Sequence, residues 1–247
     1  MALHRLIHPE SSAPLAPGPI TIAGDEAHHA ARSKRLEPGD AVEILDGAGA
    51  RARATIARVH KLGKGTRAEW ALDLSITHVA HEAPAAPAIH VRSAAPKGER
   101  LEALIDALSQ VGAASWGTLV SERAIVEPRE GKLSRLDRTA GEAMKQCGRS
   151  HRLTIHADHA PLEAVLAAPP ARGPVVVADA SGGPYARLGA AEIPLVVGPE
   201  GGFSPADLAR ARAAGARVCA FGPHAMRIEA AAFAACAVML HAEHAPA

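Results

Sequence analysis

The sequence is short of aromatic residues, cysteines and excess charge, and each shortage excludes a class of protein. Aromatic side chains make up 2% of its 247 residues, too few for a protein that binds single strands by stacking bases on aromatic platforms. Its three cysteines follow no C-x-x-C or zinc-finger spacing, which excludes a disulfide framework and indicates a reducing compartment. With 27 Lys plus Arg against 26 Asp plus Glu, any nucleic-acid surface must be a local patch.

Long apolar runs and several common motifs are also missing. No segment supplies the roughly 18 apolar residues of a membrane span, and the N-terminal stretch lacks the apolar core of a signal peptide. We therefore expect a soluble, cytoplasmic protein that has no membrane partner. The glycine signatures of dinucleotide, nucleoside-triphosphate and serine-hydrolase sites do not occur. His241 and His244 lack the H-E-x-x-H pattern, so we expect no metal.

The most informative stretch begins with a short apolar run that ends at a glycine. Leu195 to Val197 reads as a strand buried on both faces of a parallel sheet, and the loop GPEGGFS follows it. Ser204 is a suitable N-cap for the next helix, Pro205 fits the first turn and Gly215 ends it. The pattern predicts a strand, a glycine loop and a helix in succession.

The same pattern recurs at once. Arg217 to Phe221 reads as a second strand, Gly222 and Pro223 turn the chain, and an alanine-rich helix is predicted from about Arg227 to His241. Ligands of open α/β sheets bind beyond the carboxyl ends of the strands, and glycines there let backbone amides approach a ligand. The two loops therefore predict one ligand site.

The rest of the chain divides into two regions that differ in composition. Short apolar runs separated by turn residues predict a small β-barrel over residues 1–80, interrupted by one helix from about Asp25 to Leu36. The Pro/Ala-rich segment 81–87 reads as a linker. Strands alternate with helices beyond it, which predicts a mostly parallel sheet covered by helices over residues 81–247. The expected strands lie at 88–94, 116–120, 153–156 and 174–179, and the expected helices at 99–111, 134–147 and 162–166.

The ordered pair GPEGGFS and FGPHAMRIEAA resembles the RsmE group of SPOUT methyltransferases. The departures from the family pattern at the second loop are His224 for Arg, Met226 for Leu, Ile228 for a smaller residue and Ala230 for Thr. Further departures lie at Ala107, Gln110 and Lys145. The chain matches the pattern at Gly198, Pro199, Glu200, Gly201, Gly202, Phe203, Ser204, Gly222, Arg227 and Glu229.

The resemblance implies an S-adenosylmethionine-dependent enzyme that methylates N3 of a uridine in 16S ribosomal RNA of the small ribosomal subunit. It also implies a PUA-like N-terminal domain, a C-terminal trefoil knot and a homodimer, which we expect to pack through the alanine-rich last helix, although that helix could equally pack on its own sheet. The expected cofactor-binding residues are Val197, Gly198, Pro199, Glu200, Gly201, Gly202, Phe221, Gly222, Met226 and Arg227.

Three charged residues are candidates for catalysis. Methylation of uridine N3 removes a proton from the Watson-Crick edge, so charge develops on the base. Arg227, at the junction of the second loop and its helix, is the candidate cation for that charge. Glu229 or Glu200 is the candidate general base, although for Glu200 an acceptor of backbone N–H bonds that fixes its loop is the favoured interpretation.

The predicted RNA contacts are basic or amide side chains on the N-terminal helix and at loop positions of the second domain. His29, Arg32 and Arg35 stand where the family has a His-x-x-Arg-x-x-Arg pattern, and an ordinary solvated basic face is the alternative. The full expected set is His29, Arg32, Lys34, Arg35, Lys97, Arg123, Gln146 and Arg149. Two alternative functions stay open: a related enzyme that acts on another RNA position, and a non-catalytic RNA-binding factor in ribosome assembly.

Overall fold

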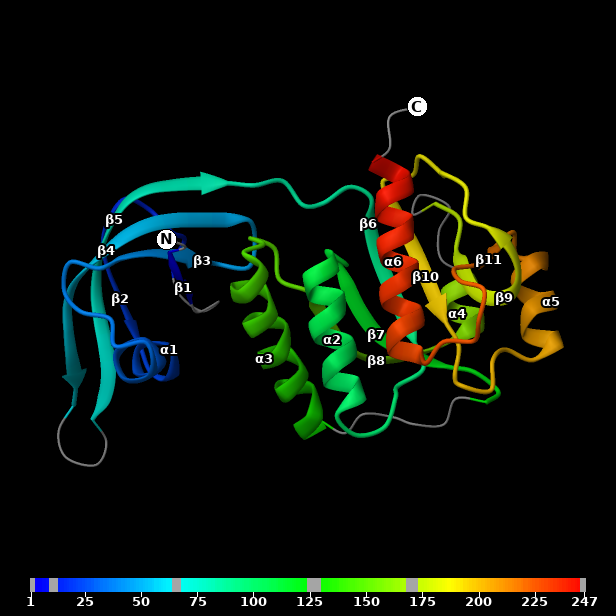
Figure 1. The fold of residues 1–247 in the computed structure, drawn as a ribbon, viewed down its shortest axis with the longest axis horizontal. Coiled ribbons are helices and arrows are strands. Elements are labelled where there is room, and N and C mark those ends of the chain that lie inside the picture. The colour runs from blue at the N-terminus through cyan, green and yellow to red at the C-terminus, as the bar shows by residue number, and fades with distance from the viewer. Residues whose placement is uncertain (1–2, 9–12, 64–67, 124–129, 168–172, 245–247) are drawn as a thin grey trace. The chain divides into compact units, whose positions relative to one another are not determined.

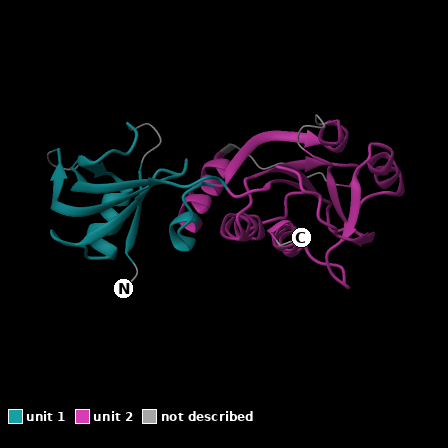
Figure 2. Cartoon of the chain, turned by 90° about the horizontal axis from the view of Figure 1, so that it is seen from above, with its two compact units in different colours: residues 1–84, 144–152 teal, residues 85–143, 153–247 magenta. Residues whose placement is uncertain are grey.

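The computed structural model describes residues 3–8, 13–63, 68–123, 130–167 and 173–244. The chain forms two compact units, shown in teal and magenta in Figure 2. Unit 1 combines residues 1–84 with residues 144–152, and unit 2 contains residues 85–143 and 153–247. The sequence-based domain limits, 1–80 and 81–247, stay a prediction.

Unit 2 is built on a parallel sheet in the order β11-β9-β10-β6-β7-β8. This confirms the predicted parallel α/β fold; the trefoil knot stays a prediction. Its strands are β6 (Ala88–Ser93), β7 (Ser115–Val120), β8 (Thr154–Pro161), β9 (Val176–Pro184), β10 (Glu192–Val197) and β11 (Arg217–Ala220).

Helices cover both faces of this sheet (Figure 1), as the uninterrupted apolar strands predict. Leu195 and Val197 of β10 face the core beneath α2, α3 and α6, whereas Val196 between them belongs to the core beneath α4 and α5. The helices are α2 (Arg100–Val111), α3 (Glu130–Cys147), α4 (Leu162–Leu166), α5 (Pro205–Ala213) and α6 (Ile228–His244).

The start of α5 confirms the predicted cap. The Ser204 hydroxyl accepts the Asp207 N–H at 3.1 Å, and the Asp207 carboxylate accepts the Ser204 N–H at 3.2 Å. Two backbone donors at the helix start are thereby satisfied. Since Ser204 ends the GPEGGFS loop, this cap also fixes where the loop stops.

Three expected element limits in unit 2 are wrong by more than three residues. Strand β8 reaches Pro161, beyond the predicted end at residue 156, through a shift of register against β7. Helix α3 begins at Glu130, not at Ser134, because Ser134 lies one turn inside the helix, where its hydroxyl bonds back to the Gly131 carbonyl at 3.3 Å. Strand β9 extends to Pro184, beyond the predicted end at Asp179, through a shift of register against β11. That shift shapes the candidate site.

Unit 1 has a five-stranded sheet in the order β1-β3-β4-β5-β2, antiparallel except for the β1·β3 pair. Alternate residues of β4 are buried, as expected of strands with one face on a core. The sequence did not predict β1, whose run is very short. The strands are β1 (His4–Ile7), β2 (Gly18–Ala23), β3 (Ala41–Leu45), β4 (Ala50–Leu62) and β5 (Glu69–His81).

The predicted helix from Asp25 to Leu36 is shorter and changes its winding. It comprises α1 (Asp25–His28), followed by a π-helical turn, η1 (His29–Ser33). Arg35 then adopts a left-handed backbone with φ 55°. The regular helix predicted from Asp25 to Leu36 therefore ends before Arg35.

None of the helices in the described part of the chain is long and apolar enough to cross a membrane.

Candidate active site

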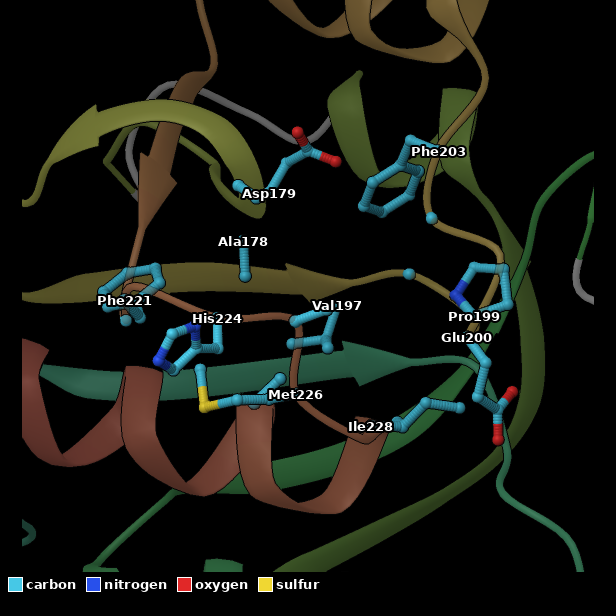
Figure 3. A pocket seen from close by; sticks show the side chains of 16 residues that line it. Ala178, Asp179, Val197, Pro199, Glu200, Phe203, Phe221, His224, Met226 and Ile228 are labelled. Carbon is cyan, nitrogen blue, oxygen red and sulfur yellow. The ribbon is translucent and has the colours of Figure 1, made fainter.

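The two glycine loops of unit 2 line a single surface pocket, which we call the cofactor hollow. The sequence predicts such a site for loops at the carboxyl ends of parallel strands. The hollow has a volume of about 170 Å³. Figure 3 shows its labelled side chains, with Val197 and Met226 toward the middle and Asp179, Phe203 and Glu200 around the edge. Of the predicted cofactor residues, Val197, Gly198, Pro199, Glu200, Gly202, Phe221, Gly222 and Met226 line it.

The first loop is folded tightly at Gly198. A Cβ at this position would lie 2.9 Å from the Phe203 ring, so only glycine lets the loop return over its own start. Phe203 is 7% exposed and belongs to the core beneath α5. Gly202 has φ 67°, a conformation that favours glycine. Glycine is therefore required at Gly198 by a close contact and favoured at Gly202 by its backbone conformation.

Arg100, at the start of α2, joins the two candidate carboxylates. Its Nη1 lies 3.2 Å from Glu200 Oε1 and 3.9 Å from Glu229 Oε2. The Glu229 side chain is 19% exposed, and its Oε2 is buried without a hydrogen-bond partner among the described residues. The arginine therefore holds together carboxylates from the first loop and from the start of α6.

Arg123 holds the same loop from another side. Its Nη1 donates a hydrogen bond of 2.8 Å to the Gly201 carbonyl oxygen. The sequence predicts this residue as an RNA contact, and in the structure its guanidinium is used at least in part to fix the glycine loop. Gly201 itself is absent from the lining of the hollow and touches the Arg123 side chain instead.

The second loop is more exposed. Residues 222–227 are all exposed, and the Met226 side chain, 37% exposed, lies against Gly222 at the hollow. Arg227 does not line the hollow; it precedes α6, and its carbonyl accepts the Ala231 N–H at 2.8 Å. Arg227 is exposed and lies in sequence between two residues of the lining, Met226 and Ile228.

The sequence reasoning missed one wall of the hollow. Ala178, Asp179 and Ala180 line it from β9, where the register against β11 jumps from Val177 to Gly183. The Asp179 carboxylate accepts hydrogen bonds from the Ser181 N–H and hydroxyl at 2.9 and 2.7 Å. The position of Asp179 directly after the apolar run 175–178 was the available signal. The remaining lining residues are His224 and Ala225 of the second loop, together with Phe203, Ile228 and Ala231, which were not predicted.

The predicted RNA contacts fall in both units. Exposed His29, Arg32, Lys34 and Arg35 belong to unit 1. Gln146 and Arg149 also group with unit 1, since residues 144–152 pack with it, whereas exposed Lys97 and Arg123 belong to unit 2. Arg149 is half-buried, and burial lowers the pKa of its guanidinium.

His29, Lys34 and Lys145 of unit 1 lie near His4. The His4 and His29 rings lie 6.4 Å apart. Burial lowers the pKa of His4, and the positive charges of Lys34 and Lys145 lower it further. Lys145 Nζ pairs with Glu26 Oε1 at 2.6 Å, so this departure from the family pattern has a partner on α1. The cluster is a local basic patch of the kind that the balanced net charge requires.

The described residues hold no group of three His, Cys, Asp or Glu side chains arranged for a metal ion.

Sequence comparison identifies the class. A family profile described as RNA methyltransferase domain matches residues 83–240, and one described as RNA methyltransferase PUA domain matches residues 22–63. The first match covers more than half of the chain, so the chain belongs to the RNA methyltransferase domain family. The PUA match falls on the β domain of unit 1, which confirms the expected PUA-like N-terminal domain.

Individual relatives agree with the expected RsmE resemblance. Ribosomal RNA small subunit methyltransferase E of Synechocystis is 28% identical over 237 residues, covering 92% of this chain and 73% of the relative. The protein of that name from Mycobacterium bovis is 27% identical, with 85% and 82% covered. The crystal structure of a Neisseria gonorrhoeae protein of that name, bound to S-adenosyl methionine, shares the fold, with a TM-score of 0.80, 22% identity and 97% and 98% covered.

Proposed function

We propose that this chain uses S-adenosylmethionine to methylate N3 of a uridine in small-subunit (16S) ribosomal RNA, in the cytoplasm. The observation that carries the proposal is the single hollow bounded by both glycine loops at the carboxyl ends of β10 and β11. Relatives named as small-subunit ribosomal RNA methyltransferases support the substrate. The position N3 rests on the RsmE resemblance.

The residues of the hollow fit the cofactor. Val197, Phe203 and Ile228 supply apolar surface that suits an adenine ring, and the glycine loops bring backbone amides to the wall. The unoccupied space in front of Gly202, where a Cβ would meet nothing within 4 Å, leaves room for a ligand to approach the backbone. When bound, the cofactor supplies an electrophilic methyl group.

The chain's own residues would then orient the uridine and manage its charge. Glu229 or Glu200 accepts the N3 proton, and Arg100 keeps these two carboxylates beside one another. Arg227, exposed between the lining residues Met226 and Ile228, would supply a cation to the carbonyl oxygens on which negative charge develops. The target base must be unpaired, because N3 is otherwise hydrogen-bonded within a base pair.

The basic side chains of unit 1 are proposed to bind the RNA backbone. His29, Arg32, Lys34 and Arg35 are exposed, and Gln146 and Arg149 belong to the same compact unit. Lys97 and Arg123 would extend the contacts along unit 2. Phosphate contacts of this kind position the RNA without reading its sequence.

A homodimer is also proposed. Helix α6 leaves Phe233 and Val238 more than 40% exposed among small alanines, which allow close approach of a second backbone. Burying such side chains at an interface is favourable. A light-scattering mass of one chain at micromolar concentration would contradict the dimer.

Two measurements test the function. Calorimetry should show S-adenosylmethionine binding to the folded chain, and mass mapping of ribosomal RNA should show an N3-methyluridine that disappears when the gene is deleted. A methyl group found at another nucleotide would favour the related-enzyme alternative. Ribosome binding without any cofactor heat would instead favour the non-catalytic assembly factor.

A further inference from the structure

A second hollow lies on the other side of the β9 irregularity from the cofactor site. Its volume is about 470 Å³. The cofactor hollow is lined by residues 178–180 of β9, and this second one by residues 181–184 of the same strand. The two cavities therefore flank a single segment of the chain.

The charged residues among the described lining of this hollow are all arginines: Arg187, Arg212 and Arg217. Arg187 Nε lies 4.0 Å from Glu243 Oε2, a buried carboxylate that also accepts hydrogen bonds from Tyr185, Leu188 and Gly189. The positive charge offered to a ligand is therefore mainly that of Arg212 and Arg217. We call this cavity the arginine hollow.

The backbone beside these arginines leaves open space for a ligand. A Cβ on Gly182 would lie 2.5 Å from the Val218 backbone, so Gly182 lets β9 pack closely on β11. A Cβ on Gly183, which lines the hollow, would meet no atom within 4 Å. The space above Gly183 is thus open.

One contact ties the arginine hollow to the cofactor site. Arg212 Nη2 lies 3.4 Å from Ser181 Oγ, and the Ser181 hydroxyl donates to the Asp179 carboxylate at 2.7 Å. Asp179 lines the cofactor hollow. A group held by Arg212 would therefore be one hydroxyl away from a side chain of the methyl-transfer site.

We propose that the arginine hollow binds a phosphate group of the RNA substrate. Guanidinium forks match phosphate oxygens in pairs, and a cavity that offers more than one of them without a lining carboxylate favours a multiply charged oxyanion. The assignment to RNA rests on the proposed function, because an RNA strand that delivers a nucleotide to the cofactor hollow carries its phosphates past the adjoining cavity. A free phosphate compound is the other source of the same chemistry.

The first test removes the positive charges of Arg212 and Arg217 from the arginine hollow. Arg212→Gln with Arg217→Gln should weaken binding of a fluorescent single-stranded RNA about tenfold or more. The slope of log affinity against log salt should flatten by roughly 0.7 for each phosphate that the variant no longer binds. Arg138→Gln, which removes an exposed charge on α3 away from the hollow, is the matched control. A double variant that matches this control in RNA affinity and salt slope overturns the proposal.

A second pair of variants protects against misfolding. Gly183→Glu and Gly183→Gln add the same volume to the open space and differ in charge. The glutamate should weaken RNA binding several-fold more than the glutamine, while S-adenosylmethionine affinity stays equal in the two. Equal RNA affinities contradict a site for an anion.

A third measurement distinguishes an RNA phosphate from a free phosphate compound as the ligand of the arginine hollow. Inorganic phosphate titrated into the wild-type chain should compete with RNA only at millimolar concentrations. Tight phosphate binding that leaves RNA affinity unchanged overturns the RNA assignment. Cofactor binding and methylation by the wild type, measured in parallel, show whether the proposed function itself has failed.

Discussion

The two glycine loops around the cofactor hollow differ in how firmly unit 2 holds them. The first loop is fixed by the Phe203 ring over Gly198, by the Ser204 cap and by hydrogen bonds from Arg100 and Arg123. The second loop, residues 222–227, is exposed throughout. A rigid loop is suited to holding a cofactor, whereas an exposed one is suited to meeting an RNA.

The largest expected effect comes from the exposed loop. Arg227→Ala should cut single-turnover methylation roughly 10²-fold or more, the scale of losing one transition-state donor, while S-adenosylmethionine affinity stays within several-fold. Rapid-quench kinetics at saturating RNA, with calorimetry for the cofactor, make the measurement. Unchanged turnover together with weaker RNA binding would instead make Arg227 a phosphate contact.

Adding one methyl group to the first loop at Gly198 should weaken cofactor binding. Gly198→Ala places a carbon against the Phe203 ring, whereas Gly201→Ala meets nothing closer than 3.7 Å. Overpacking of this kind costs about 1–3 kcal/mol, so cofactor affinity should fall about thirtyfold in the first variant and little in the second. Equal affinities in calorimetry would show that the close contact does not shape the binding conformation.

A smaller effect is expected at Arg100, which lies close to Glu200 of the first loop and to Glu229 of α6. Arg100→Ala should lower the methylation rate about tenfold, because a hydrogen bond to a charged group contributes about 1.5 kcal/mol or more, and Arg100→Lys should restore part of it. Its effect on stability should be small, since the Arg100 side chain is 37% exposed and surface ion pairs contribute about 0–1 kcal/mol. A changed pH profile of the rate would mark a positioning role, and a lower melting temperature with a normal rate would contradict it.

The sequence predicted the parts of this site that depend on neighbouring residues. The strand before Gly198, the loop and the Ser204 cap follow from local chemistry, and all three are confirmed. Arg100 and Glu200 are 100 residues apart, so their pairing depends on the sheet order and carries no local pattern. The role of Asp179 depends on the register shift between β9 and β11, which a single strand does not encode.

The misjudged helix in unit 1 has a similar cause. The sequence from Asp25 to Leu36 has helical composition throughout, yet only Asp25–His28 is regular α-helix. A π-turn adds one residue to the winding, a change that composition does not reveal. The departure at Lys145 was visible in the sequence, but its Glu26 partner lies 119 positions away and becomes apparent only in the fold.

The smallest expected effect concerns the side chain that the exposed loop places over the hollow. Met226 is 37% exposed and packs against Gly222. Truncation to alanine removes a few apolar groups, each worth about 0.8 kcal/mol when fully buried, so Met226→Ala should weaken S-adenosylmethionine binding roughly fivefold. Met226→Leu, which keeps the volume and introduces the residue of the RsmE pattern, should bind nearly as the wild type does. If the alanine variant binds the cofactor as tightly as the leucine variant, the Met226 side chain takes no part in holding it, and the first loop and the β9 wall supply the binding surface instead.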